Sequence, residues 1–449
     1  MADHKPIENK RVLVLSTGDV NGAYEAAYRI AKFLYEAGYQ TTMLVKKKTR
    51  PDKFIIEVKP FHLFGKKKIA TGFLNFLSKR VQNTILGLFK IQTDPKYIFY
   101  AEEKSMYDSG KLILSQLDFK PDLVLACLTN DYVNTQTLVE LKKFSNAEIV
   151  MVTMDMVPFT GGCHYAWDCK GYETGCSNCP AIIDEKYKNL AHENLMIKRK
   201  NIVKANLKIL TGAGWALNQA KESFLFKEQK EILNINSCID TNLFNNKNRS
   251  YAKNIFDLPQ NSKVIFVGSQ HINDERKGVL FAIEALRVLW NNLDIYLRDK
   301  VYIVVVGNLN DSSLTDQILF KKKYIEYIKD YRLLTLLYQA STIFLCSSIE
   351  DAGPMMVSEA LACGTPVVGF EMGVTSNMVI NGYNGFKAEL RNSLQLAEGI
   401  KKILLLTDDE FKTYSDNAVL QVESYSSQHV VISAIEKLLN HIPDLKKNL

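Results

Sequence analysis

The sequence predicts an α/β protein built from two doubly wound, parallel-sheet domains. Three observations lead to this prediction. The chain has 449 residues, which is more than a single hydrophobic core usually holds. Its first half alternates short apolar runs with amphipathic helical segments, and a second alternation of similar size begins near residue 263. Apolar residues make up 47% and charged residues 23%, which is the balance of a folded globular protein.

The amino-terminal series reads as strand, helix and strand, and then repeats. Short apolar runs predict strands, and apolar residues three and four positions apart predict helices. The predicted elements are strand 11–16, helix 23–38, strand 41–45, strand 123–127, helix 135–144 and strand 148–153. Because helices join consecutive strands, the strands are expected to run parallel.

The second series has the same alternation. Its predicted elements are strand 263–268, helix 278–289, strand 301–307, strand 342–346, helix 355–363 and strand 366–370. We therefore expect an amino-terminal domain over 1–236 and a second domain over 237–425. Residues 426–449 are expected to form a final helix that returns to the first domain. Ligands of such sheets bind at the carboxyl ends of the strands.

Composition and charge exclude several function classes. Fifty-six Lys and Arg against 49 Asp and Glu leave a net charge of +7, too small to indicate nucleic-acid binding. No apolar run reaches the 18 residues of a membrane span, and the first residues lack the apolar core of a secretory signal. The sequence thus predicts a cytoplasmic protein.

Acidic residues follow one predicted strand of the second domain. Glu350 and Asp351 come directly after it, and Glu359 lies on the next helix, eight residues after Asp351. Carboxylates there can accept hydrogen bonds from sugar or ribose hydroxyls. The alternative is a helix-capping Asp351 and a solvated Glu359. Backbone N–H groups at the start of this helix suit a phosphate group, and they belong to Gly353, Met355 and Met356.

This acid-x7-acid region resembles that of the retaining glycosyltransferases of family four, which have the GT-B architecture of two Rossmann-like domains. The resemblance implies that Glu350 and Asp351 contact the donor sugar and act in catalysis, and that Glu359 binds the ribose of the sugar nucleotide. The family usually has Glu as the first acid, where this chain has Asp351.

Two further segments extend the resemblance. In the first, Arg276 and Lys277 stand at the entry to a helix, where family members hold the donor diphosphate with basic side chains. Many members have Arg after the preceding glycine, and this chain has Ser269 there. In the second, the turn that ends at Gly22 resembles the glycine-rich turn that meets the donor phosphate or the acceptor; a simple tight turn is the alternative. All four residues are candidate donor-binding residues.

Four cysteines lie within seventeen residues, at Cys163, Cys169, Cys176 and Cys179. Their segment resembles the Gly-Gly-Cys-His-Tyr…Cys-Pro insertion of a bacterial subgroup of the same family that acts in exopolysaccharide and O-antigen assembly. The spacing suits one structural zinc ion, and disulfides or free thiols are the alternatives. Just before the insertion the subgroup has His-Asp, whereas this chain has Met154-Asp155. The resemblance makes Asp155 a catalytic candidate; His164 or a backbone group takes the place of the missing His, or the acceptor chemistry differs.

Residues 46–91 form a basic amphipathic segment. Such a segment suits the surface of an anionic membrane, and an ordinary core-facing helix with a solvated basic side is the alternative. The first interpretation would place the protein peripherally at the inner face of the membrane.

The resemblance implies a hexosyltransferase of surface polysaccharide assembly. It would move a sugar from a UDP- or GDP-linked donor to a glycan or lipid-linked acceptor, with retention of configuration and without a catalytic metal. A glycan phosphorylase of the same architecture is a rival, although no pyridoxal lysine is indicated. The second rival is a catalytically degenerate scaffold that binds sugar nucleotides. It is favoured by the departures from the family pattern at Met154 and Asp351.

Overall fold

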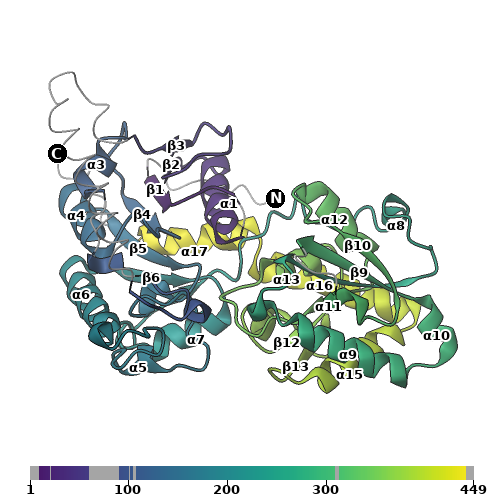
Figure 1. Ribbon diagram of the computed structural model, residues 1–449. Coiled ribbons are helices and arrows are strands. Elements are labelled where there is room, and N and C mark those ends of the chain that lie inside the picture. The colour runs from purple at the N-terminus through teal and green to yellow at the C-terminus, as the bar shows by residue number, and fades with distance from the viewer. Residues whose placement is uncertain are drawn as a thin grey trace. The chain divides into compact units, whose positions relative to one another are not determined.

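The computed structural model describes residues 10–20, 22–59, 91–100, 102–104, 108–308 and 313–440. They form two compact units. The first holds the described residues up to Leu210, then Gln219–Leu233 and those from Ile435 onward. The second holds Thr211–Asn218 and Asn234–Ala434. Figure 1 labels the helices and strands of both units.

The first unit is built on a seven-stranded sheet with the order β3-β2-β1-β4-β5-β6-β7. Its strands are β1 (Arg11–Ser16), β2 (Gln40–Val45), β3 (Ile55–Glu57), β4 (Leu123–Ala126), β5 (Glu148–Thr153), β6 (Lys208–Thr211) and β7 (Leu233–Asn234). The pairs from β3 through β5 are parallel. The strand order reverses at β1 and β4. Because these two strands are parallel, the loops that follow them leave the same edge of the sheet at this switch point.

Helices cover this sheet (Figure 1). They are α1 (Gly22–Glu36), α3 (Gly110–Leu114), α4 (Thr135–Ser145), α5 (Gly171–Thr174) and α6 (Leu190–Ala205). A further helix, α7 (Gly214–Glu222), begins in the second unit, and its residues from Gln219 on belong to the first. The sequence explains the ends of α4. Asn134 caps its start by accepting the Thr137 N–H, and Asn146 ends it with a left-handed φ of 60°. The strands β1, β4 and β5 are almost entirely buried, because helices cover a parallel sheet on both faces.

The second unit is built on a six-stranded parallel sheet with the order β10-β9-β8-β11-β12-β13. Its strands are β8 (Lys263–His271), β9 (Val301–Asn308), β10 (Lys321–Ile325), β11 (Ile343–Cys346), β12 (Val367–Phe370) and β13 (Gly385–Ala388). Here the order reverses at β8 and β11. The predicted fold class, two parallel-sheet α/β domains, is therefore confirmed.

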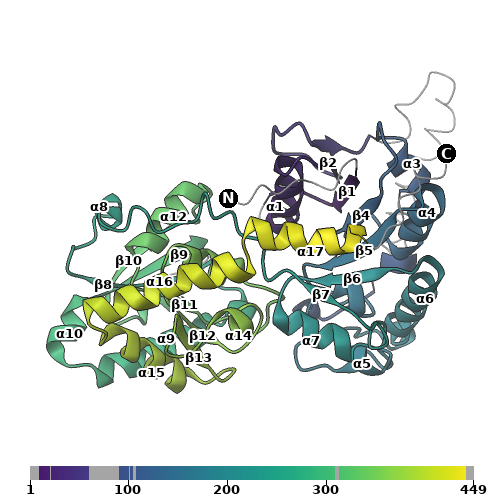
Figure 2. The ribbon, with the colours of Figure 1, turned by 180° about the vertical axis from the view of Figure 1, so that it is seen from behind.

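The helices of this unit are α8 (Ala252–Ile255), α9 (Val279–Asn292), α10 (Ile295–Lys300), α11 (Ser313–Asp316), α12 (Tyr331–Ala340), α13 (Met355–Ala362), α14 (Thr375–Met378), α15 (Ser393–Leu404) and α16 (Asp408–Tyr425). The helix α13 contacts α12 and α16, and α9 contacts α15. A final helix, α17 (Gln428–Asn440), follows α16 (Figure 2). From Ile435 it belongs to the first unit, where Tyr39 Oη donates to Glu436 Oε1 at 2.5 Å.

The basic amphipathic segment predicted over 46–91 lies largely outside the described residues, because 60–90 are not among them. Within the described part of the chain, no helix is long and apolar enough to cross a membrane.

Candidate functional site

The two loops that follow β8 and β11 are bonded to each other. Arg276 O accepts the backbone N–H groups of Ile349 (2.8 Å) and Glu350 (3.3 Å). Ser347 Oγ donates to Lys277 O at 2.9 Å. The two sequence segments that carried most of the resemblance thus meet at the switch point of the second sheet, where doubly wound folds bind ligands.

Gly278 makes this close approach possible. Its φ of +61° is in the left-handed region, and a Cβ atom built on it would lie 2.0 Å from Ser347 O. Both the backbone conformation and the contact therefore require glycine. Gly278 also directly precedes α9, so the same residue fixes the loop and starts the helix.

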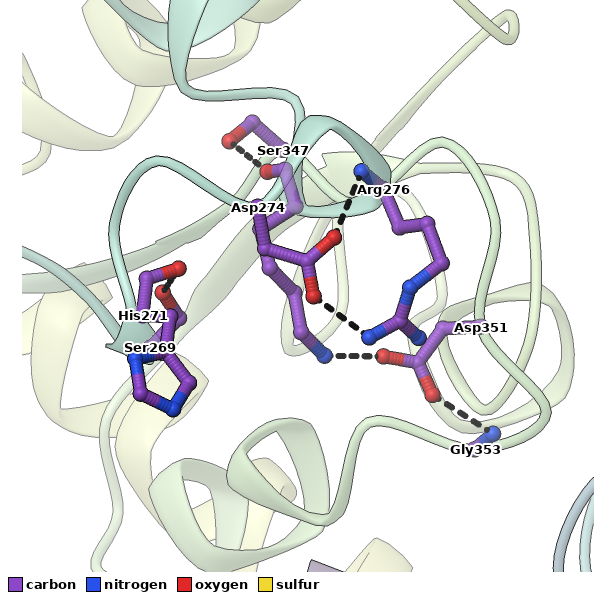
Figure 3. Close-up of polar contacts among 8 residues, drawn as sticks. Ser269, His271, Asp274, Arg276, Ser347, Asp351 and Gly353 are labelled. Carbon is purple, nitrogen blue, oxygen red and sulfur yellow. Dashed lines mark hydrogen bonds and ion pairs between the residues drawn. The ribbon is translucent and has the colours of Figure 1, made fainter. Parts of the chain in front are cut away.

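Two ion pairs occupy this junction (Figure 3). Lys277 Nζ pairs with Asp351 Oδ2, and the Arg276 guanidinium pairs with Asp274 Oδ2. Asp351 Oδ1 also accepts the Gly353 N–H at 3.1 Å. Burial acts to raise the pKa of Asp351. Lys277, Arg276 and the Gly353 N–H outweigh burial and hold this pKa below its ordinary value, so Asp351 is ionised at neutral pH.

The start of α13 lies beside the Asp351 pair. Pro354 stands at the capping position and no side chain caps the helix, so the first backbone N–H groups, of Met355 and Met356, are available to an anion. The alternative in which Asp351 caps this helix is wrong, because its Oδ1 accepts from Gly353 instead.

Glu359 is buried on α13, with 2% of its surface exposed, and its Oε2 accepts a hydrogen bond from Tyr338 Oη at 3.1 Å. The solvated alternative for Glu359 is therefore wrong. Glu350 is also buried, at 8% exposed. The structure thus offers three carboxylates within one strand–loop–helix unit, two of them buried and one, Asp351, paired with a lysine.

Two predicted donor-binding residues are not part of this cluster. Ser269 Oγ donates to His271 O at 2.8 Å, and both residues stand away from the ion pairs in Figure 3. Gly22 is in the first unit, where it begins α1 with a φ of +50°. Their part in donor binding stays a prediction.

In the first unit, Asp155 follows β5 and is buried, at 4% exposed. Its Oδ1 accepts the Val157 N–H at 2.9 Å, and its Oδ2 lies 2.5 Å from His164 Nδ1. The second ring nitrogen, Nε2, lies 2.9 Å from Asn130 Nδ2. Sequence reasoning named Asp155 but missed Asn130. The available signal was its place just after β4, the strand beside β5.

The four clustered cysteines do come together. Cys163, Cys169, Cys176 and Cys179 all line one cavity of about 20 Å³, which has room for about one water molecule. All four are free thiols. Cys163 donates a hydrogen bond to Cys179, and this bond is the main cause that lowers the pKa of Cys179 to about 7. Among the residues described here, no group of three or more His, Cys, Asp or Glu is arranged to hold a metal ion, so the predicted zinc site is not supported.

Comparison with known proteins connects this geometry to a family. Residues 250–419 match the family model "Glycosyl transferases group 1".

The chain is also similar to individual proteins. It is 28% identical over 149 residues to the N,N'-diacetylbacillosaminyl-diphospho-undecaprenol alpha-1,3-N-acetylgalactosaminyltransferase of Campylobacter jejuni, covering 31% of this chain and 38% of the relative. It is 22% identical over 200 residues to the N-acetyl-alpha-D-glucosaminyl L-malate synthase of Bacillus anthracis, covering 43% and 49%. The chain thus spans less than half the length of these relatives.

Solved structures match over nearly the whole chain. A glycosyltransferase from Rickettsia africae superimposes with a TM-score of 0.63 at 16% identity, covering 98% of this chain and all of the other. Anabaena Alr3699/HepE, solved in complex with UDP and glucose, superimposes with a TM-score of 0.61 at 16% identity, covering 96% and 100%. Such low identity establishes the fold alone. The chain therefore has the GT-B fold, and its residues 250–419 match the glycosyl transferases group 1 model.

Proposed function

We propose that this protein is a hexosyltransferase that moves a sugar from a nucleoside-diphosphate donor to a hydroxyl of a glycan or lipid-linked acceptor. The observation that carries the proposal is the junction at the ends of β8 and β11. There Arg276 and Lys277 stand beside the uncapped start of α13 and beside the carboxylate of Asp351. Cations, backbone N–H groups and a carboxylate are the groups that a diphosphate joined to a sugar requires.

The chemistry follows from where charge develops. When the bond between the sugar and the diphosphate breaks, the leaving diphosphate gains negative charge, and fixed cations stabilise it. Lys277 is held by Asp351, and an arriving diphosphate would compete for the same ammonium group. Asp351 and Glu350 would then accept hydrogen bonds from donor sugar hydroxyls, and Glu359 from the ribose. Because two side chains supply positive charge, we propose that transfer needs no catalytic metal.

The proposals for the donor nucleotide, the acceptor and the stereochemistry rest on similarity to other proteins. Alr3699/HepE was solved with UDP, which supports a UDP-linked donor before a GDP-linked one. The name of the Campylobacter relative specifies a diphospho-undecaprenol acceptor, which supports a lipid-linked acceptor, surface polysaccharide assembly and a place at the inner face of the membrane. Retention of configuration is proposed from the resemblance of the acid-x7-acid region.

Calorimetry with UDP, GDP and ADP, followed by assays of donor hydrolysis and transfer, tests the proposal. The comparison is between the wild type, Lys277→Ala and Lys329→Ala, in which Lys329 is an exposed lysine of the same unit. We expect nucleotide binding and turnover in the wild type and in Lys329→Ala, and loss of turnover in Lys277→Ala. Nucleotide binding without turnover of any donor would identify the degenerate scaffold instead, and no nucleotide binding would overturn the proposal.

A further inference from the structure

The loops after β4 and β5 carry a buried polar chain that the proposed donor site does not use. These two strands are neighbours, so the residues that follow them leave the same edge of the first sheet. Asp155 and His164 are 4% and 7% exposed, and Asn130 completes the chain. Asn130 is only half-buried, but burying the other two polar side chains costs free energy unless they find polar partners.

The contacts define the direction of this chain. An amide NH₂ group can only donate, so His164 Nε2 accepts from Asn130 Nδ2 at 2.9 Å and the ring proton lies on Nδ1. Nδ1 lies 2.5 Å from Asp155 Oδ2, the distance of an ion pair. One order of donors and acceptors runs from Asn130 through His164 to Asp155, and it fixes both the imidazole and the carboxamide in orientation.

The backbone of the loop 157–164 has other supports. Thr160 Oγ1 donates to Cys163 O at 2.7 Å. Lys198, which is 2% exposed, donates from Nζ to the carbonyl oxygens of Val157 (2.6 Å) and Thr160 (3.0 Å). These bonds hold the loop backbone without the imidazole.

The far end of the polar chain reaches a cavity. Asn130 and Asp155 line a space of about 30 Å³ beyond β4 and β5, together with Thr129, Asn134 and Glu103. Aromatic rings stand nearby. The ring of Tyr100 lies edge-on to His164 with centroids 4.8 Å apart. Burial raises the pKa of Tyr24, and Tyr100 and Asp155 add to this shift, so Tyr24 belongs to the same neighbourhood.

We infer that His164 is a positioning residue: with Asp155 it orients the Asn130 carboxamide to bind a hydroxyl of a saccharide acceptor. A carboxamide suits a hydroxyl because it both donates and accepts. The inference rests on the proposed function and adds a binding site for the acceptor. The histidine of this site comes from the cysteine-rich segment.

Binding measurements on the full-length protein test the inference. The probes are methyl glycosides of glucose, galactose, mannose and N-acetylglucosamine. Their binding is measured by saturation-transfer NMR. His164→Ala and Asn130→Ala should weaken glycoside binding by about tenfold or more, because each removes the bond between Asn130 and His164 that orients the carboxamide. His164→Gln, which keeps a side-chain donor and acceptor, should retain part of the binding. The matched control is His192→Gln, since His192 Nδ1 bonds to the carbonyl oxygen of Gly175 in the same region.

The outcomes separate this inference from the proposed function. UDP affinity should be unchanged in all four variants, because Asn130 and His164 belong to the first unit and Lys277 to the second. Glycoside binding that depends on His164 without any UDP binding would sustain the inference and overturn the proposed function. If no glycoside binds the wild type, or if His164→Ala and Asn130→Ala bind as well as His192→Gln, the inference is wrong. In a transfer assay, His164→Ala should raise the acceptor KM more than it lowers kcat.

Discussion

Lys277 and Asp351, seventy-four positions apart in the chain, form an ion pair at the junction of the β8 and β11 loops. Their side chains are 28% and 11% exposed, so neither charge is freely hydrated. The pair holds a cation beside the start of α13, and an anionic ligand would find that cation already in place. This relationship leads to the first prediction.

Lys277→Ala should lower kcat/KM for transfer by about a hundredfold, since removing one fixed group that stabilises developing negative charge typically costs two to three orders of magnitude in kcat. Donor Kd should change less, because most of the charge develops in the transition state. Steady-state kinetics beside calorimetry measures both, with Lys329→Ala as the control. Equal losses in kcat/KM and in donor affinity would show that Lys277 binds the ground state and the transition state alike.

Glu359→Gln should weaken UDP binding by roughly ten- to a hundredfold if Glu359 accepts hydrogen bonds from the ribose, because charged acceptors contribute about 1.5–3 kcal/mol. Tyr338→Phe separates this role from a structural one. It removes the Tyr338 Oη bond to Glu359 and should lower stability by about 1 kcal/mol while leaving UDP affinity nearly unchanged. Calorimetric Kd values that are the same for Glu359→Gln and the wild type would exclude Glu359 from the nucleotide site.

Gly278→Ala should destabilise the second unit by roughly 3 kcal/mol, because the added Cβ meets both a left-handed φ and the Ser347 carbonyl oxygen. Gly22→Ala is the matched control: its φ is +50°, but nothing lies within 4 Å of the place that its Cβ atom would take. The control should cost only about 1 kcal/mol. Urea unfolding followed by circular dichroism compares the two. Similar losses for both variants would mean that the contact with Ser347 is not limiting.

Cys179 should react with iodoacetamide at neutral pH. The thiolate is the reactive form, so a pKa of about 7 predicts a rate that rises as the pH increases through 7 and levels off above it. Cys163→Ala removes the bond that lowers this pKa and should move the whole profile to higher pH. Cys127 serves as the internal control, because burial raises the pKa of its thiol. Mass spectrometry of the alkylated peptides gives the rates.

Protection of all four clustered thiols, with about one zinc ion per chain by elemental analysis, would contradict this prediction. It would show that the cysteines around the small cavity bind metal after all, as their spacing suggests.

Local patterns in the sequence were enough to predict most elements of both sheets. The apolar runs of β1, β5 and β11 coincide with their predicted strands within one residue. β10 (Lys321–Ile325) escaped prediction for a physical reason. It is an edge strand, paired with β9 alone, and its sequence Lys-Lys-Lys-Tyr-Ile lacks the apolar run of a buried strand.

Residue types and their spacing in the chain indicated the parts of the donor site. Acids before and within a helix, two cations before another helix and a cluster of cysteines are all features of short segments, and hydrophobic periodicity places such segments on strands, loops and helices. Backbone preferences act over a few residues, so these features can be recognised in the sequence without knowing which segments contact each other in the fold.

Only the tertiary structure decided which of these groups meet. Strand order places the β8 loop against the β11 loop, so that Lys277 forms an ion pair with Asp351. The same approach requires glycine at Gly278, because a Cβ atom there would meet Ser347 O. Packing of α13 against α12 buried Glu359 beside Tyr338, although spacing alone allowed a solvated residue. The fold of the cysteine-rich segment turned His164 toward Asp155 and Asn130. Each of these pairings depends on contacts between distant segments, whose energies come from burial and sheet order, and no local pattern encodes them.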